Sequence, residues 1–88
     1  MAIGLTKEAL EYYILTCLSI EDMYGAQILE TVSSAVSIKS TSLYELLDVL
    51  EEEGKITKIP TAVDGVSCNL CSITALGQNY LNAFLKAR

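Results

Sequence analysis

The chain has 88 residues, of which 51% are hydrophobic and 19% are charged, and its formal net charge is −5 at pH 7. Such an apolar composition excludes a disordered chain, and the length allows at most one domain. Because the chain contains no histidine, it cannot by itself build a Ser-His-Asp or Cys-His catalytic site or a zinc site with a histidine ligand.

The first predicted helix runs from Thr6 or Lys7 to Ile20. Thr6 suits the N-cap position, and the carboxylate of Glu8 suits the first turn of a helix. The apolar residues of this segment cover more than one stripe. We therefore expect the helix to be buried on two sides, one facing the domain core and the other facing a partner.

A second helix is predicted after Asp22, which is taken as its N-cap. Apolar residues recur at Tyr24, Ile28 and Val32, and this spacing places them on one helical face. The serine-rich end of the segment leads into a short turn over residues 35–39.

The third helix is predicted from Ser40, as N-cap, to Glu53, and Gly54 suits the position that ends it. Its buried stripe is leucine-rich and comprises Leu43, Leu46, Leu47 and Leu50. A short turn between two such helices is typical of a helix-turn-helix unit.

Two extended stretches, residues 55–63 and 66–73, flank the dipeptide Asp64-Gly65. This dipeptide between two β-rich runs predicts a hairpin with a type I′ turn. Pro60 has no backbone N–H, so it either places the first strand at a sheet edge or marks a bulge.

A last helix begins after Thr74 as N-cap and runs to the end of the chain, with an apolar stripe at Leu76, Tyr80, Leu81, Phe84 and Leu85. The whole order predicts a mainly α fold with a small β-hairpin, the winged helix-turn-helix. We expect a single domain over 1–88, with the last helix (about 74–88) as a dimerisation element.

Three motifs occur in order. Residues 23–29 read Met-Tyr-Gly-Ala-Gln-Ile-Leu, residues 42–56 read Ser-Leu-Tyr-Glu-Leu-Leu-Asp-Val-Leu-Glu-Glu-Glu-Gly-Lys-Ile, and residues 73–78 read Ile-Thr-Ala-Leu-Gly-Gln. In these motifs the chain resembles the PadR-like transcriptional regulators nearly from end to end. The resemblance implies a homodimeric repressor that places its third helix in the major groove of double-stranded DNA.

The resemblance also implies the site residues. By position, the DNA-facing set comprises Lys39, Ser40, Thr41, Ser42 and Tyr44, with Lys55 and Lys58 as the other cations available for phosphates. For the interface between the first helix and the partner's last helix we expect Leu10, Tyr13, Ile14, Cys17, Leu76, Tyr80, Leu81 and Phe84.

The chain departs from the family pattern where relatives carry cations. The third helix has Asp48-Val49 at its middle, and residues 68–71 of the returning wing strand carry no charge. These departures favour an alternative, a winged helix that has lost DNA binding and binds protein. A second alternative is a ligand-sensing dimer in which Tyr12, Tyr13 and Phe84 line a pocket; the competing interpretation is plain interface packing.

Other classes receive no support. No carboxylate pair, nucleophile–base pair or glycine-rich phosphate loop predicts an enzyme, a cofactor or a metal site. Cys17, Cys68 and Cys71 are interpreted as reduced structural residues. No apolar run approaches the roughly 20 residues of a membrane span, and residues 1–5 contain no basic leader, so we expect a cytoplasmic protein.

Overall fold

The computed structural model describes residues 6–86 of the chain. Its elements in chain order are α1 (Lys7–Ile20), β1 (Met23–Tyr24), α2 (Gly25–Ser33), α3 (Ser40–Glu52), β2 (Ile56–Val63), β3 (Val66–Ile73) and α4 (Ala75–Lys86). The predicted layout of three helices, a hairpin and a fourth helix is confirmed, and one short strand is added to it. The prediction of no basic leader concerns residues 1–5, which lie outside the described residues, as do the last two residues of the predicted final helix.

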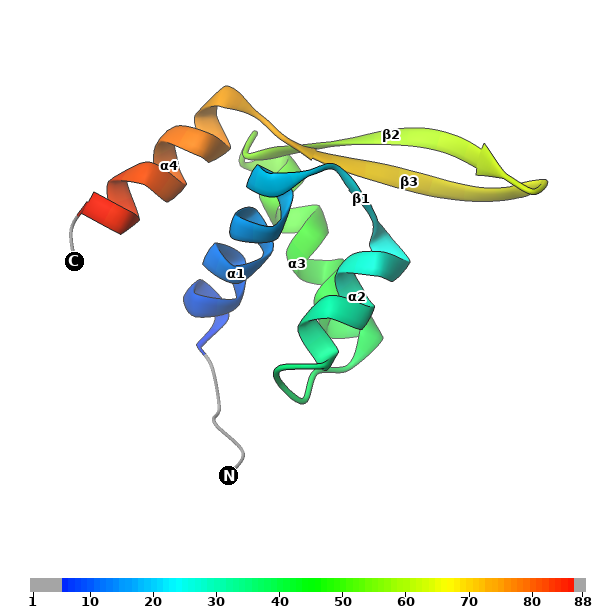
Figure 1. Ribbon diagram of the computed structural model, residues 1–88, viewed down its shortest axis with the longest axis horizontal. Coiled ribbons are helices and arrows are strands. Elements are labelled where there is room, and N and C mark those ends of the chain that lie inside the picture. Colours follow the sequence, from blue (N-terminus) through cyan, green and yellow to red (C-terminus); the bar gives the residue numbers. More distant parts are fainter. Residues whose placement is uncertain (1–5, 87–88) are drawn as a thin grey trace.

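The sheet is antiparallel, with the strand order β1-β3-β2. The turn residues Asp64 and Gly65 both have positive φ, at 52° and 78°, as the predicted type I′ turn requires. Strand β2 is an edge strand, which explains how it accommodates Pro60. Figure 1 shows the hairpin of β2 and β3 extending away from the helices as a wing.

The sequence did not predict β1, which pairs with β3. The prediction that Asp22 caps the second helix is wrong, because the chain stays extended to Tyr24, which is the N-cap. The Tyr24 N–H donates to Oε1 of Gln27 at 2.9 Å. The Asp22 carboxylate accepts a hydrogen bond from the Ser72 hydroxyl at 2.8 Å and so ties β1 to the wing strand.

The other predicted helix ends are mostly confirmed. Thr6 caps α1, since its Oγ1 accepts from the Ala9 N–H at 3.1 Å. Thr74 caps α4, since its Oγ1 accepts from the Gly77 N–H at 3.0 Å. Gly54, with φ 78°, follows the end of α3 in the left-handed conformation that a helix C-terminus favours.

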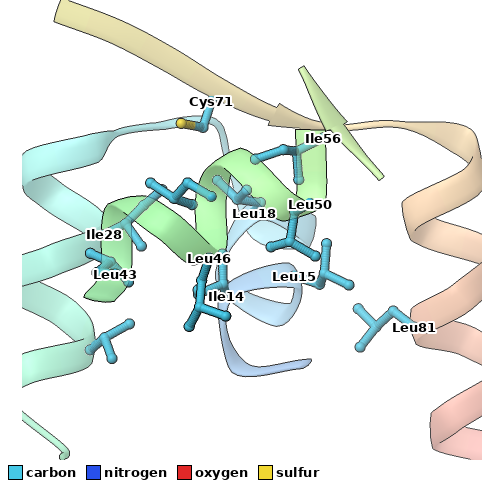
Figure 2. Packing of buried hydrophobic residues seen from close by; sticks show 12 residues of the cluster. Ile14, Leu15, Leu18, Ile28, Leu43, Leu46, Leu50, Ile56, Cys71 and Leu81 are labelled. Carbon is cyan, nitrogen blue, oxygen red and sulfur yellow. The ribbon is translucent and has the colours of Figure 1, made fainter. Parts of the chain in front are cut away.

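The core gathers between α1, α2, α3 and the base of the sheet (Figure 2). The predicted leucine stripe of α3 is confirmed, and all four of its members are buried. Helix α4 contributes Leu81, which points toward Leu15 of α1. The buried hydrophobic residues are Ile14, Leu15, Leu18, Ile28, Val32, Leu43, Leu46, Leu47, Leu50, Ile56, Cys71 and Leu81.

The three cysteines are free thiols, and Cys71 is buried in the core. Burial raises the pKa of the Cys17 thiol and, despite the nearby charge of Lys58, that of Cys71. These two thiols are therefore weak nucleophiles near neutral pH. Within residues 6–86, no helix is both long and apolar enough to cross a bilayer.

Candidate nucleic-acid interface

The start of α3 is an exposed, positively polarised helix end. Lys39, Ser40, Thr41 and Ser42 are all exposed there. The N-cap is Lys39, without a side-chain cap, so the prediction of Ser40 as N-cap is wrong by one residue. The first turn contains no acidic residue. Because the first N–H groups of a helix lack partners within it and carry partial positive charge, this end favours an anion.

Tyr44 follows one turn later on α3. Its side chain is 43% exposed, and a Cβ on Gly25 would stand 3.1 Å from its Cε1 atom. The glycine at the start of α2 thus leaves room for the tyrosine ring. Tyr44 packs against α2 along one side and remains accessible at the edge of the cleft between α3 and the wing.

Lys55 and Lys58, the other predicted DNA contacts, bind carboxylates of their own chain. Lys55 Nζ lies 2.9 Å from Glu53 Oε1, and the Lys55 side chain is only 13% exposed. The same Nζ lies 3.6 Å from the centroid of the Tyr80 ring. Both contacts hold the ammonium group of Lys55 between the end of α3 and α4.

Lys58 projects from β2 toward α3. Its ammonium forms an ion pair with Asp48 and lies 3.7 Å from Glu51 Oε1, with 15% of the side chain exposed. Burial alone would lower the pKa of Lys58, but the hydrogen bond to Asp48 and the charge of Glu51 outweigh burial and raise this pKa above its ordinary value. The ion pair offsets the acidic charge on the middle of α3.

The predicted contact set therefore separates into two groups. Lys39, residues 40–42 and Tyr44 share the start of α3, whereas Lys58 binds Asp48 in its second half and Lys55 follows its end. At about 1.5 Å per residue, Asp48 lies about 12 Å and the end of α3 about 18 Å from Ser40 along the helix axis. Among the described residues, Lys39 forms no ion pair within 4.0 Å, so its charge is available to a ligand.

The seam between α1 and α4 is closed by aromatic rings. Tyr12 stacks on Tyr80 with ring centroids 5.0 Å apart and on Phe84 at 3.7 Å. Two of the predicted interface residues, Ile14 and Leu81, are buried in the core of the single chain. Tyr12 and Phe84 therefore pack against each other within one chain.

The remaining predicted interface residues are at least partly accessible. Leu76 is 54% exposed on α4. Intermediate exposure is found for Tyr13, Cys17, Tyr80, Phe84 and Leu10, of which Leu10 faces α3 rather than α4. The seam therefore keeps an accessible apolar margin after its own rings have packed.

No protein-family model and no curated protein matches this sequence. Solved structures do match. The structure of smu.1704 from Streptococcus mutans UA159 superposes with a TM-score of 0.90 and 29% identity, covering 99% of this chain and 82% of that one. A PadR-like transcriptional regulator from Bacillus cereus (BC4206) superposes with a TM-score of 0.81 and 26% identity, covering 92% of this chain and 82% of that one.

Bacillus subtilis PadR, solved in complex with operator DNA, gives a TM-score of 0.74 at 27% identity, covering 86% of this chain and 47% of that one. These likenesses extend over most of the chain and agree with the three sequence motifs. The predicted resemblance is therefore confirmed, and the chain has the winged helix-turn-helix fold of the PadR-like transcriptional regulators.

Proposed function

We propose that the chain is a DNA-binding transcriptional regulator, acting as a homodimeric repressor in the cytoplasm. The observation that carries the proposal is that α3 begins in an exposed turn at Lys39, without a side-chain cap. The fold around it is shared with a PadR solved in complex with operator DNA. Fold alone does not fix function, so the chemistry of this turn is essential to the argument.

In this proposal α3 enters the major groove with its N-terminal turn leading. Lys39 and the first-turn N–H groups face phosphates, and the hydroxyls of residues 40–42 reach phosphates or base edges. A homodimer presents two such turns to half-sites about one helical turn of DNA, roughly 34 Å, apart. Repression follows if that occupied DNA is a promoter.

Lys39→Ala tests the contact directly. Because it removes a cation from each α3 start, it is expected to weaken binding to the operator about fivefold to tenfold and to flatten the salt dependence. Fluorescence anisotropy with DNA from upstream of the chain's own gene measures both effects. Lys86→Ala, an exposed lysine on α4, is the matched control. Equal affinity of Lys39→Ala and wild type at every salt concentration would contradict the proposed contact.

Asp48→Asn is expected to strengthen DNA binding about threefold. The change removes a carboxylate from α3 and releases the ammonium of Lys58 from its ion pair, so the positive charge near the DNA increases. Glu52→Gln removes the same charge from the exposed end of α3 without releasing a lysine. If Asp48→Asn and Glu52→Gln gain the same affinity for DNA, the ion pair with Asp48 does not restrain Lys58.

Leu76→Glu is expected to dissociate the homodimer, because it places a charge on the exposed apolar margin of α4. Sedimentation equilibrium should give twice the chain mass of 9.6 kDa for wild type and the single mass for the variant. Ile59→Glu, at a half-exposed apolar position on the wing, should remain dimeric. If the Leu76→Glu variant remains dimeric, the dimer interface does not include this part of α4.

A second candidate, a protein-binding winged helix, is favoured by the wing. Residues 59–73 contain Asp64 as their one charged residue, and Ile59, Val63 and Val66 are exposed on the hairpin. Such a surface offers phosphates no cation. If wild type does not bind DNA and Ile59→Glu abolishes capture of a protein from lysate, this candidate replaces the first.

A further inference from the structure

The exposed side of α3 carries a row of carboxylates. Thr41, Glu45, Asp48 and Glu52 follow one another at intervals of four, three and four residues, and this spacing places them on one helical face. All four residues are exposed, and their face lies opposite the leucine stripe that packs into the core. In the proposed complex this is the side of α3 that faces the bases, because the opposite side is buried.

Ion pairs and position distinguish Glu45 from the other carboxylates of α3. Asp48 and Glu51 bind the ammonium of Lys58. Among residues 6–86, Glu45 and Glu52 form no ion pair within 4.0 Å. Glu52 lies about 18 Å from the start of the helix along its axis, whereas Glu45 lies only about 7.5 Å from it. Because recognition helices contact base edges with their N-terminal residues, Glu45 is the unpaired carboxylate that reaches the bases.

A carboxylate at this place selects among the four bases, because its oxygens only accept hydrogen bonds. In the major groove cytosine presents the N4 amino donor and no acceptor. Guanine presents two acceptors, thymine an acceptor and a methyl group, and adenine a donor beside an acceptor. We propose that Glu45 is a specificity-determining residue that accepts a hydrogen bond from the N4 amino group of a cytosine in each half-site. This inference rests on the proposed function and adds to it the base that is recognised.

The charge of Glu45 acts mainly against the wrong sequences. Phosphates repel a carboxylate, so Glu45 lowers the affinity for every DNA in which no amino group meets it. Lys7 and Lys39 line the same open groove between α1 and α3 as Glu45. Their charges, together with the positive end of the α3 dipole, moderate this repulsion. A group that penalises competing partners is one of the ways in which an interface gains specificity.

The test uses duplexes that the wild-type chain selects from a randomised DNA pool. In the selected sequence, replacing the recognised C·G pair by T·A should lower the affinity about tenfold in fluorescence anisotropy, because this change exchanges the amino donor for an acceptor. Glu45→Ala should reduce the loss to less than about twofold at the same position. Glu45→Gln should prefer adenine there, because an amide can accept from N6 and donate to N7 of adenine.

Glu52→Ala is the matched control, because it removes the same charge from the same exposed face. It should raise the affinity for selected and scrambled duplexes alike and leave the base preference unchanged. If Glu45→Ala keeps the wild-type preference at every position, or loses a preference only at an A·T pair, the role of Glu45 is wrong while the proposed function stands. If the wild-type chain selects no sequence and binds no duplex, the proposed function fails, and the role of Glu45 fails with it.

Discussion

Gly77→Ala is expected to destabilise the chain by about 3 kcal/mol, despite the higher helix propensity of alanine. A Cβ at this position would stand 2.1 Å from the carbonyl oxygen of Lys55 and 3.0 Å from Ile73 Cγ1. The carbonyl cannot move away easily, because it accepts from the Thr74 N–H at 3.0 Å, and the Lys55 N–H in turn donates to Leu50 O at 2.9 Å. The start of α4 must therefore lift from the turn after α3.

Urea unfolding followed by circular dichroism measures this loss. Stabilities of about 0.05–0.15 kcal/mol per residue make 3 kcal/mol a large share of the total for a chain of this length. Asn79→Ala, at an exposed position of the same helix, should change the midpoint only slightly. If Gly77→Ala unfolds at the wild-type urea concentration with an unchanged slope, α4 does not approach Lys55 as closely as described.

Leu50→Ala is the second substitution with a large effect, again about 3 kcal/mol. Leu50 is completely buried on α3 and belongs to the cluster that contains Leu15 of α1 and Ile56 of β2 (Figure 2). The truncation removes three carbons and leaves a cavity, which the surrounding elements cannot fill by moving inward. Such substitutions lower the free energy of unfolding by about 2–5 kcal/mol.

The same unfolding measurement checks Leu50→Ala. Val66→Ala, at an exposed position on the wing, should cost less than about 0.5 kcal/mol. An equal loss in both variants would show that burial does not determine the stability of α3. Because α3 also carries the proposed DNA contacts, Leu50→Ala should weaken DNA binding only in proportion to the unfolded fraction.

Local chemistry made much of the fold predictable. The Asp64-Gly65 turn needs two residues that tolerate positive φ, and the dipeptide supplies them. The leucine stripe of α3 follows from helical periodicity. Strand β1 has no such signal, because it is two residues long and depends on a partner strand far along the chain. For the same reason Asp22 was mistaken for a cap: its partner is Ser72.

The candidate site was predictable only in part. The exposed start of α3 follows from its place after the α2–α3 turn. The ion pair between Lys58 and Asp48 depends on how β2 lies against α3, which residue spacing does not reveal. A count of lysines in the sequence therefore overestimates the number of cations available to DNA, because Lys55 and Lys58 are paired within the chain.

DNA binding by the chain is measured by titrating wild-type protein against its own upstream DNA and against a scrambled duplex over a range of salt concentrations. We expect tighter binding to the upstream DNA, with a slope of log K against log salt of about −2, because two Lys39 side chains, one per protomer, neutralise phosphates. No binding to either duplex at low salt, where electrostatic attraction is strongest, would contradict it.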